Sequence, residues 1–155
     1  MNRRQFLVSC MGLGAALSAT GLLTKANGAP KTYQVAWSHY VGWTPWEYAR
    51  HAGMLKKHAD RHGVNIELVL VDKYMDSVTA FTGGTFAGCA MTNMDALTNP
   101  AVGGVDSTAI IVGDYSNGND GIVLKKGSTV SDLKGRDITL VQYSVSHYLL
   151  SRALE

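Results

Sequence analysis

A cluster of aromatic residues early in the chain could bind a flat solute. Trp37, Tyr40, Trp43 and Trp46 fall in the stretch WSHYVGWTPW, which holds all three tryptophans of the chain. Flat rings stack on planar groups and hold cations over their faces. We expect Trp46 to pack in the core and the other three rings to form one wall of a binding site.

Two carboxylates could complete such a site. Asp95 is equally suited to cap a helix, and Asp114 lies at a predicted strand end, where carboxylates often serve turns. No Arg or Lys lies within residues 37–46, 93–98 or 114–120. A site for a doubly charged anion would usually recruit arginine, whereas helix N-termini alone can hold a monoanion such as nitrate or a sulfonate. The residue types therefore favour a neutral or cationic solute.

The remaining reactive side chains fit binding or packing better than catalysis. Ser144, Ser146 and His147 stand at a predicted helix start, where one serine is expected to cap the helix. Ser146 and His147 are neighbours, so on a helix they point about 100° apart and cannot form a catalytic pair. His58 and His62 have zinc-compatible spacing, but no Glu follows His58 and the flanking lysines indicate a solvated face. We expect no catalytic residue, no metal and no cofactor.

The first 29 residues have the pattern of an export signal. Arg3 and Arg4 precede an apolar run rich in Gly, Ala and Leu, which ends in small residues. The two arginines followed by QFL resemble a twin-arginine signal. Cys10 resembles a lipid-attachment site, but the apolar run follows this cysteine when it should precede it. We expect export to the periplasm through the twin-arginine or Sec machinery, without a lipid anchor at Cys10.

Composition beyond this signal bounds the remaining possibilities. The chain has 155 residues, 46% of them hydrophobic, which suffices for a globular domain with a core. Three of its 14 basic residues lie in the signal, so the rest holds fewer basic than its 12 acidic residues and nothing favours a nucleic-acid partner. Cys89 is the one cysteine beyond the signal; it excludes an intramolecular disulfide and is expected to pack as a small hydrophobe.

Strand-like and helix-like segments then alternate along the chain. Strands are predicted at residues 33–38, 65–72, 86–93 and 107–115, and helices at 44–63, 75–84 and 94–104. Thr44, Pro45 and Glu47 predict a capping box, Gly53 a bend or break, and Pro100 a helix stop. The alternation predicts an α/β fold with a parallel sheet covered on both faces. Ligands bind at the carboxyl ends of strands in such sheets. The main candidate binding segments are therefore WSHYVGW, TNMD and GDYSNGND, and VDKYMD is a lesser candidate.

A second α/β unit begins in the last third of the chain. Residues 121–127 and 137–142 are strand-like, and residues 143–155 predict a helix. One such unit cannot cover both faces of a sheet, so we read the chain as the N-terminal portion of a larger fold. Asn117, Gly118 and Asn119, between the two units, suit positive backbone φ and could absorb a hinge rotation.

These stretches together resemble a known family. GWTPWEYARHAGMLKKH, TNMDAL, DYSNGNDGIVLKKGSTVSDLKGRDITL and SVSHYLLSRALE are similar to periplasmic solute-binding proteins of ABC importers, of the nitrate/sulfonate/taurine type. The closest subgroup is the one associated with urea carboxylase. The resemblance covers residues 31–155 and implies a type II periplasmic-binding-protein fold, with two α/β lobes joined by a hinge. Residues 30–117 would form lobe one, complete up to the crossover, and residues 118–155 the hinge strand and a truncated lobe two.

The resemblance implies a function in transport and not an enzyme. The protein would capture a guanidine- or urea-like solute between its lobes and deliver it to the permease of an ABC importer. Alternatives on the same fold are binding of a sulfonate, nitrate or an aminopyrimidine, or a thiamine-pyrimidine-synthase-like enzyme, which would need a cysteine-rich iron site. The residues expected to bind the solute are Trp37, Tyr40, Trp43, Asn93, Asp95, Asp114, Tyr115, Ser144 and Ser146.

Overall fold

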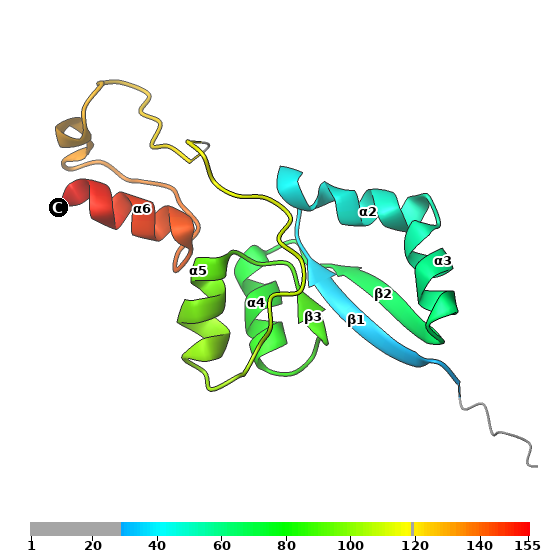
Figure 1. Cartoon of the computed structure of the whole chain (residues 1–155). Coiled ribbons are helices and arrows are strands. Elements are labelled where there is room, and N and C mark those ends of the chain that lie inside the picture. Colours follow the sequence, from blue (N-terminus) through cyan, green and yellow to red (C-terminus); the bar gives the residue numbers. More distant parts are fainter. Residues whose placement is uncertain (1–28, 119) are drawn as a thin grey trace, which may run out of the picture.

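A computed structural model describes residues 29–118 and 120–155 (Figure 1). The expected export signal with Cys10, and Asn119 of the expected hinge, lie outside the described residues. Strands and helices alternate through the first part of the described chain, as the sequence predicts. The α/β class is therefore confirmed.

A small parallel sheet forms the centre of this part. Its strands are β1 (Lys31–Trp37), β2 (Val64–Leu70) and β3 (Gly88–Cys89), in the order β2-β1-β3. β1 pairs with β2 along its whole length and with β3 only at Val35 and Ala36. Right-handed crossovers of this kind bring the carboxyl ends of successive strands to one edge of the sheet.

Two helices follow β1 where one long helix is predicted. The 3₁₀ turn η1 (Val41–Trp43) leads into α2 (Thr44–His51), and α3 (Met54–Arg61) begins after Gly53, whose φ is 69°. This left-handed conformation breaks the helix, in agreement with the bend or break predicted at Gly53. Both helices contact β2.

The predicted capping box at the start of α2 is absent. The Thr44 hydroxyl donates to the Val41 carbonyl at 2.8 Å, so it does not cap the helix. The Glu47 carboxylate instead binds the Arg50 guanidinium, which lowers the pKa of Glu47. The capping box does not form because a 3₁₀ turn precedes α2. In this turn the Trp43 N–H donates to the Tyr40 carbonyl.

Pro100 does not end the third predicted helix. α4 (Tyr74–Thr82) precedes β3, and α5 (Asn93–Ala96) continues into a π-helical turn, η2 (Leu97–Ala101), which contains Pro100. The Asn99 side-chain amide donates to the Asp95 carbonyl at 3.1 Å. That carbonyl is the one five residues before Pro100, which has no N–H to give, so the Asn99 amide replaces the missing π-helical donor.

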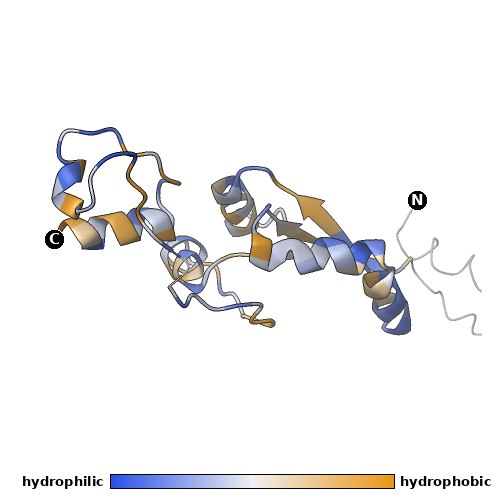
Figure 2. Ribbon diagram, turned by 90° about the horizontal axis from the view of Figure 1, so that it is seen from above, coloured by the Kyte–Doolittle hydropathy of each residue, from blue (hydrophilic) through white to orange (hydrophobic). Residues whose placement is uncertain are grey.

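The core lies between the sheet and α4. Ala36 and Trp37 of β1 and Val78 of α4 are buried, and α4 contacts both β1 and β3. Figure 2 shows hydrophobic residues on the strands of this sheet and also along extended segments outside it. Burying these apolar side chains is what holds α4 against the strands.

Three predicted strands are wrong. Residues 107–115, 121–127 and 137–142 are irregular, and no strand partner is present for them among the described residues. Ile110 is 86% exposed and Val123 is 94% exposed. A strand needs a neighbour to satisfy its backbone N–H and C=O groups, so apolar content alone cannot make these segments strands. The type II two-lobe arrangement thus remains a prediction, with a partial α/β lobe as the observed fold.

The C-terminal segment consists of short elements held by local hydrogen bonds. A 3₁₀ turn, η3 (Val130–Leu133), is capped reciprocally by Thr129 and Asp132. The backbone N–H groups of Thr129 and Ser128 lower the pKa of Asp132. The chain then enters α6 (Val145–Leu154), which lies beside α5 in Figure 1. Among the described residues no helix is long and apolar enough to cross a membrane.

Gly53 and Gly83 form a matched pair for testing the helix break. Gly53→Ala should lower the free energy of unfolding by about 1–2 kcal/mol, because alanine is strained at positive φ. Gly83→Ala should change it by less than about 1 kcal/mol, since Gly83 has φ −76° and room for a Cβ. Urea denaturation of both variants measures the difference, and equal effects would contradict the assigned conformation of Gly53.

Candidate functional site

Three aromatic rings meet at the carboxyl ends of β1 and β2. Tyr40 and Trp43 follow β1, and Tyr74 begins α4 just after β2. The Tyr40 ring centroid lies 5.0 Å from that of Trp43 and 5.6 Å from that of Tyr74. The Trp43 and Tyr74 centroids are 5.3 Å apart. We call these three residues the aromatic trio; their edge-to-face and tilted contacts stabilise one another. Tyr40 is 44% exposed, whereas Tyr74 is only 6% exposed.

The Tyr74 hydroxyl is fixed by a buried hydrogen-bond network. It donates to Asp95 Oδ2 at 2.5 Å and accepts from the Thr92 backbone N–H at 3.1 Å. The Thr92 hydroxyl donates to the same Asp95 oxygen at 2.7 Å and accepts from the Asp95 N–H at 3.1 Å. Thr92, and not Asp95, is therefore the N-cap of α5, and the network ties α4 to α5.

Burial raises the pKa of the Tyr74 hydroxyl well above its ordinary value. The hydrogen bond to the Asp95 carboxylate raises this pKa further, because a phenolate beside a carboxylate is disfavoured. Tyr74 is therefore a neutral hydrogen-bond donor across the physiological range. Asp95 itself is fully buried, and its second oxygen, Oδ1, has no hydrogen-bond partner among the residues that the structure describes.

Asp114 approaches the aromatic trio from the crossover segment. A Cβ placed on Gly42 would lie 1.8 Å from Asp114 Oδ2, so the carboxylate sits directly against Gly42. Gly42 lies in η1, between Tyr40 and Trp43. Only a residue without a Cβ allows this contact. The sequence expectation that Asp114 lies near the aromatic residues thus agrees with the structure, while a role in binding stays a prediction.

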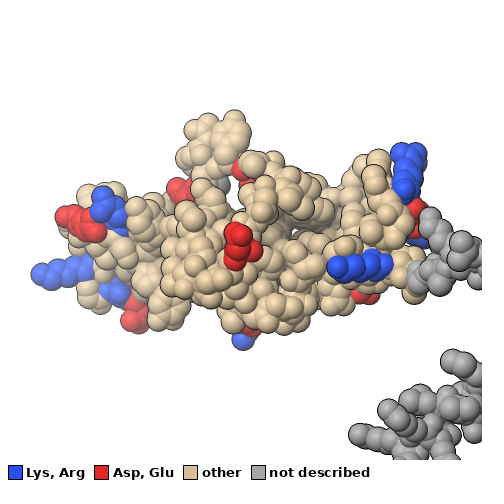
Figure 3. Space-filling model, turned by 60° about the horizontal axis from the view of Figure 1, so that its bottom comes forward, with Lys and Arg blue, Asp and Glu red and all other residues tan. Residues whose placement is uncertain are grey.

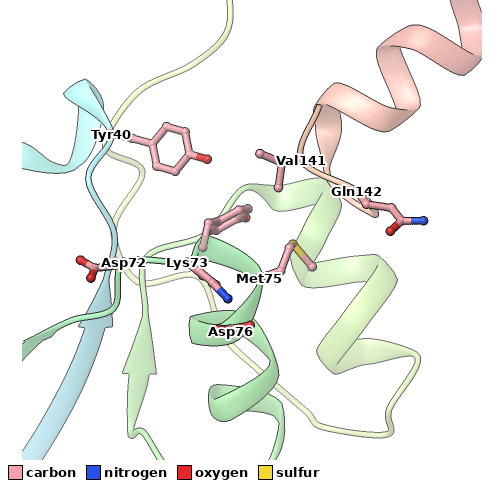
Figure 4. Close-up of a pocket in the computed structure, with 8 residues that line it drawn as sticks. Tyr40, Asp72, Lys73, Met75, Asp76, Val141 and Gln142 are labelled. Atoms are coloured by element: carbon pink, nitrogen blue, oxygen red, sulfur yellow. The ribbon is translucent and has the colours of Figure 1, made fainter. Parts of the chain in front are cut away.

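A cavity of about 350 Å³ opens beside these residues (Figure 4). It is bounded by the end of β1, the start of α4 and the segment before α6. In Figure 4 the Tyr40 ring points across the cavity towards Val141. The lining residues are Tyr40, Asp72, Lys73, Tyr74, Met75, Asp76, Val141 and Gln142. Four of them, Asp72, Lys73, Met75 and Asp76, come with Tyr74 from the stretch VDKYMD, which the sequence ranks below the other strand ends.

The charges around this cavity are mixed. Asp72 and Asp76 contribute two carboxylates and Lys73 one ammonium group. Residues 37–46, 93–98 and 114–120 contain no Arg or Lys, but Lys73 from another segment also lines the cavity. The cavity is therefore less acidic than the three segments alone would indicate. Figure 3 shows Lys and Arg scattered among acidic side chains, with no continuous basic patch on the face in view. The lining retains one more negative than positive charge.

A second cavity of about 360 Å³ lies between α5 with η2 and the start of α6. Ser144 caps α6 by accepting from the Ser146 N–H, and its hydroxyl donates to the Val141 carbonyl at 2.7 Å. His147 Nδ1 accepts from the backbone N–H of Tyr143, whose φ is 61°. The lining residues are Met94, Thr98, Asn99, Tyr143, Ser144, His147, Tyr148 and Ser151. Residues 141–144 therefore separate the two cavities.

Other expected binding residues lie apart from the aromatic trio. Trp37 is only 2% exposed and belongs to the core; an exposed wall that includes Trp37 is therefore wrong. Trp46, expected in the core, is half-buried. Tyr115 is 84% exposed and makes no ring contact among the described residues. Ser146 is also exposed.

Asn93 and the expected hinge residues Asn117 and Gly118 lie in segments outside the aromatic trio. The Asn93 side chain is exposed and accepts from the Met94 N–H at 2.9 Å, so it serves the first turn of α5. Gly118 has φ 77°, the positive value that the sequence allows for. Asn117 precedes it in the crossover segment. Rotation about this segment remains a prediction.

The cysteine and histidine candidates show no catalytic or metal-binding arrangement within the described residues. Cys89 is half-buried, its thiol lies 3.6 Å from the Ser77 hydroxyl, and burial raises its pKa. His58 and His62 are exposed on and just after α3. In the part of the chain that is described, no group of three potential ligands could hold a metal ion.

Tyr74 is the residue that sequence reasoning missed. The available signal was its place immediately after an apolar strand, in VDKYMD. An isolated tyrosine in a polar stretch gives no sign that its hydroxyl reaches a carboxylate 21 residues away. Comparisons of the chain with protein-family models, curated proteins and solved structures found no significant match.

The buried Tyr74 hydroxyl predicts a loss of stability in alkali. Its pKa is raised in the folded protein, so the unfolded chain releases this proton first as the pH rises past about 10. The free energy of unfolding should then fall with increasing pH. Tyr74→Phe should show a shallower decline between about pH 10 and 11.5. Urea denaturation across this range measures both proteins; parallel curves would contradict the assigned environment of Tyr74.

Proposed function

We propose that the protein is the exported substrate-binding component of an ABC importer and captures a small planar nitrogenous solute of the guanidine or urea type. The observation that carries this proposal is the aromatic trio, which stands at the carboxyl ends of β1 and β2 beside a cavity of about 350 Å³. This volume is at the small end of the range for small-molecule sites. The family resemblance of the motifs supports the transport role.

The chemistry of the lining supports a solute with N–H groups and no strong negative charge. Tyr40, which is 44% exposed, offers a ring face on which a planar group can stack and to which a cation is attracted by the ring quadrupole; Tyr74 also lines the cavity but is only 6% exposed. Asp72 and Asp76 in the lining offer carboxylate oxygens that accept N–H donors, and so does Asp114, which is exposed against Gly42 and does not itself line the cavity. Guanidinium is planar, carries a positive charge and has N–H donors. Urea is planar and has N–H donors but carries no charge.

Closure of the site would come from the C-terminal segment. Val141 and Gln142 line the cavity opposite Tyr40, and they belong to the part of the chain expected to form the second lobe (Figure 4). Gly118, at positive φ, lies in the crossover that connects the two parts. A rotation there would move Val141 and Gln142 relative to the aromatic trio, which is the hinge motion typical of binding proteins.

Calorimetry with five solutes tests the proposed solute class. Guanidinium or urea, titrated at micromolar to low millimolar concentration, should bind more tightly than nitrate, taurine or an aminopyrimidine. The physical reason is the excess of carboxylates over cations around the cavity. Tight binding of nitrate or taurine with no response to guanidinium or urea would refute the proposal, and an aminopyrimidine response alone would replace the solute class.

Asp114→Asn tests the carboxylate that lies beside the aromatic trio. Guanidinium affinity should fall by about 10- to 100-fold, because a charge-assisted hydrogen bond contributes about 1.5–3 kcal/mol. Urea affinity should change less, since an amide oxygen also accepts its N–H groups. Asp106→Asn is the matched control, because Asp106 is an exposed acid on the same segment. Unchanged guanidinium affinity in Asp114→Asn would reduce Asp114 to a turn residue.

A further inference from the structure

Asp95 is the most deeply buried acid of the described residues, and its environment does not fit direct contact with a solute. Its side chain is 0% exposed, and it lines neither of the two cavities described above. Both hydrogen bonds that reach its carboxylate go to Oδ2, from Tyr74 and from Thr92. A solute in the cavity therefore meets Tyr74 and does not reach the carboxylate beneath it.

We propose that Asp95 is a positioning residue, which acts on the solute through Tyr74. This inference rests on the proposed function of the aromatic trio. Tyr74 is the residue that belongs to both arrangements: its ring lines the cavity and its hydroxyl belongs to the buried network. The sequence expects Asp95 to bind the solute; the geometry assigns that contact to Tyr74, with Asp95 behind it.

Both hydrogen-bonding roles of the Tyr74 hydroxyl are filled. The O–H donates to Asp95, and the oxygen accepts from the Thr92 N–H. A phenol fixed at its hydroxyl end and enclosed by Tyr40 and Trp43 cannot swing away without breaking these bonds. The ring is thus held in place before the solute arrives, which removes the entropy cost of ordering it on binding.

The two hydrogen bonds that converge on Oδ2 are what the Asp95 carboxylate contributes to this network. Oδ1 is buried without a partner, and no salt bridge to Asp95 exists among the described residues. A buried, half-satisfied carboxylate is unfavourable compared with a neutral group. What Asp95 supplies is one buried oxygen that accepts from both Tyr74 and Thr92.

Two substitutions of Asp95 separate positioning from direct contact. Asp95→Asn keeps an oxygen that accepts from Tyr74 and Thr92, so guanidinium and urea affinities should stay within about threefold of wild type. Asp95→Leu removes the acceptor and should lower both affinities by about tenfold, because both solutes would lose the fixed ring face. Direct charge contact would instead make Asp95→Asn lose guanidinium binding selectively, and this result would overturn the proposal.

Asp76→Asn is the matched control for lost charge. Asp76 lines the same cavity, and its side chain takes no part in the Tyr74 network. If Asp76→Asn and Asp95→Leu reduced guanidinium affinity equally and spared urea, the charge of Asp95 and not its hydrogen bond would act on the solute, against the proposal. If Asp95→Leu does not fold, Tyr74→Phe carries the test: both affinities should fall together by at least about threefold, and unchanged affinities would overturn positioning.

A readout without solute keeps this inference separate from the proposed function. Proton NMR of the full chain should show a slowly exchanging Tyr74 hydroxyl signal, assigned by its loss in Tyr74→Phe. The signal should persist in Asp95→Asn and vanish in Asp95→Leu. If wild type binds neither guanidinium nor urea, the proposed solute class fails, while the hydroxyl signal still decides whether Asp95 fixes Tyr74. Absence of the signal in wild type, or its persistence in Asp95→Leu, would contradict the positioning role.

Discussion

The hydrogen bond from the Tyr74 hydroxyl to Asp95 is the interaction on which the arrangement of the site depends. It joins the first residue of α4 to α5 in the interior, where water cannot replace a missing partner. Thr92 completes the junction by bonding both residues. Because these groups are mutually satisfied, α4 and α5 hold a definite relation, and the Tyr74 ring has a definite place beside Tyr40 and Trp43. The unsatisfied Oδ1 is the cost of using a carboxylate there.

The parallel sheet explains why residues so far apart in the chain converge. β1 and β2 pair along their whole length, so the segments after them leave the sheet at one edge. Tyr40 and Trp43 leave β1 through a 3₁₀ turn, and Tyr74 leaves β2 at the start of α4. The crossover after α5 then brings Asp114 against Gly42. Each element is ordinary by itself, and the convergence is a property of the strand order.

The sequence predicted the local elements better than their contacts. The first three predicted strands, the break at Gly53 and a serine cap at the start of α6 depend on neighbouring residues, and the structure confirms them. Residues 107–115 have the same apolar character as β2 but no neighbour to pair with, so the same signal led to a wrong strand. The sequence placed Trp37 in a ligand-facing wall and Tyr74 between a strand and a helix, but both side chains are buried. Burial and partner choice are set by tertiary packing, which no single segment encodes.

The contrast between the two sides of the cavity sets the conditions for binding. Tyr40 and Tyr74 stand on elements fixed by ring contacts and buried hydrogen bonds. Val141 and Gln142 stand on an irregular segment that leads into α6. A solute that contacts both sides stabilises whichever placement of this segment gives the better contacts, and part of the binding free energy is used to order it. Under the proposed function, the rigid aromatic side would serve recognition and the C-terminal side would serve closure.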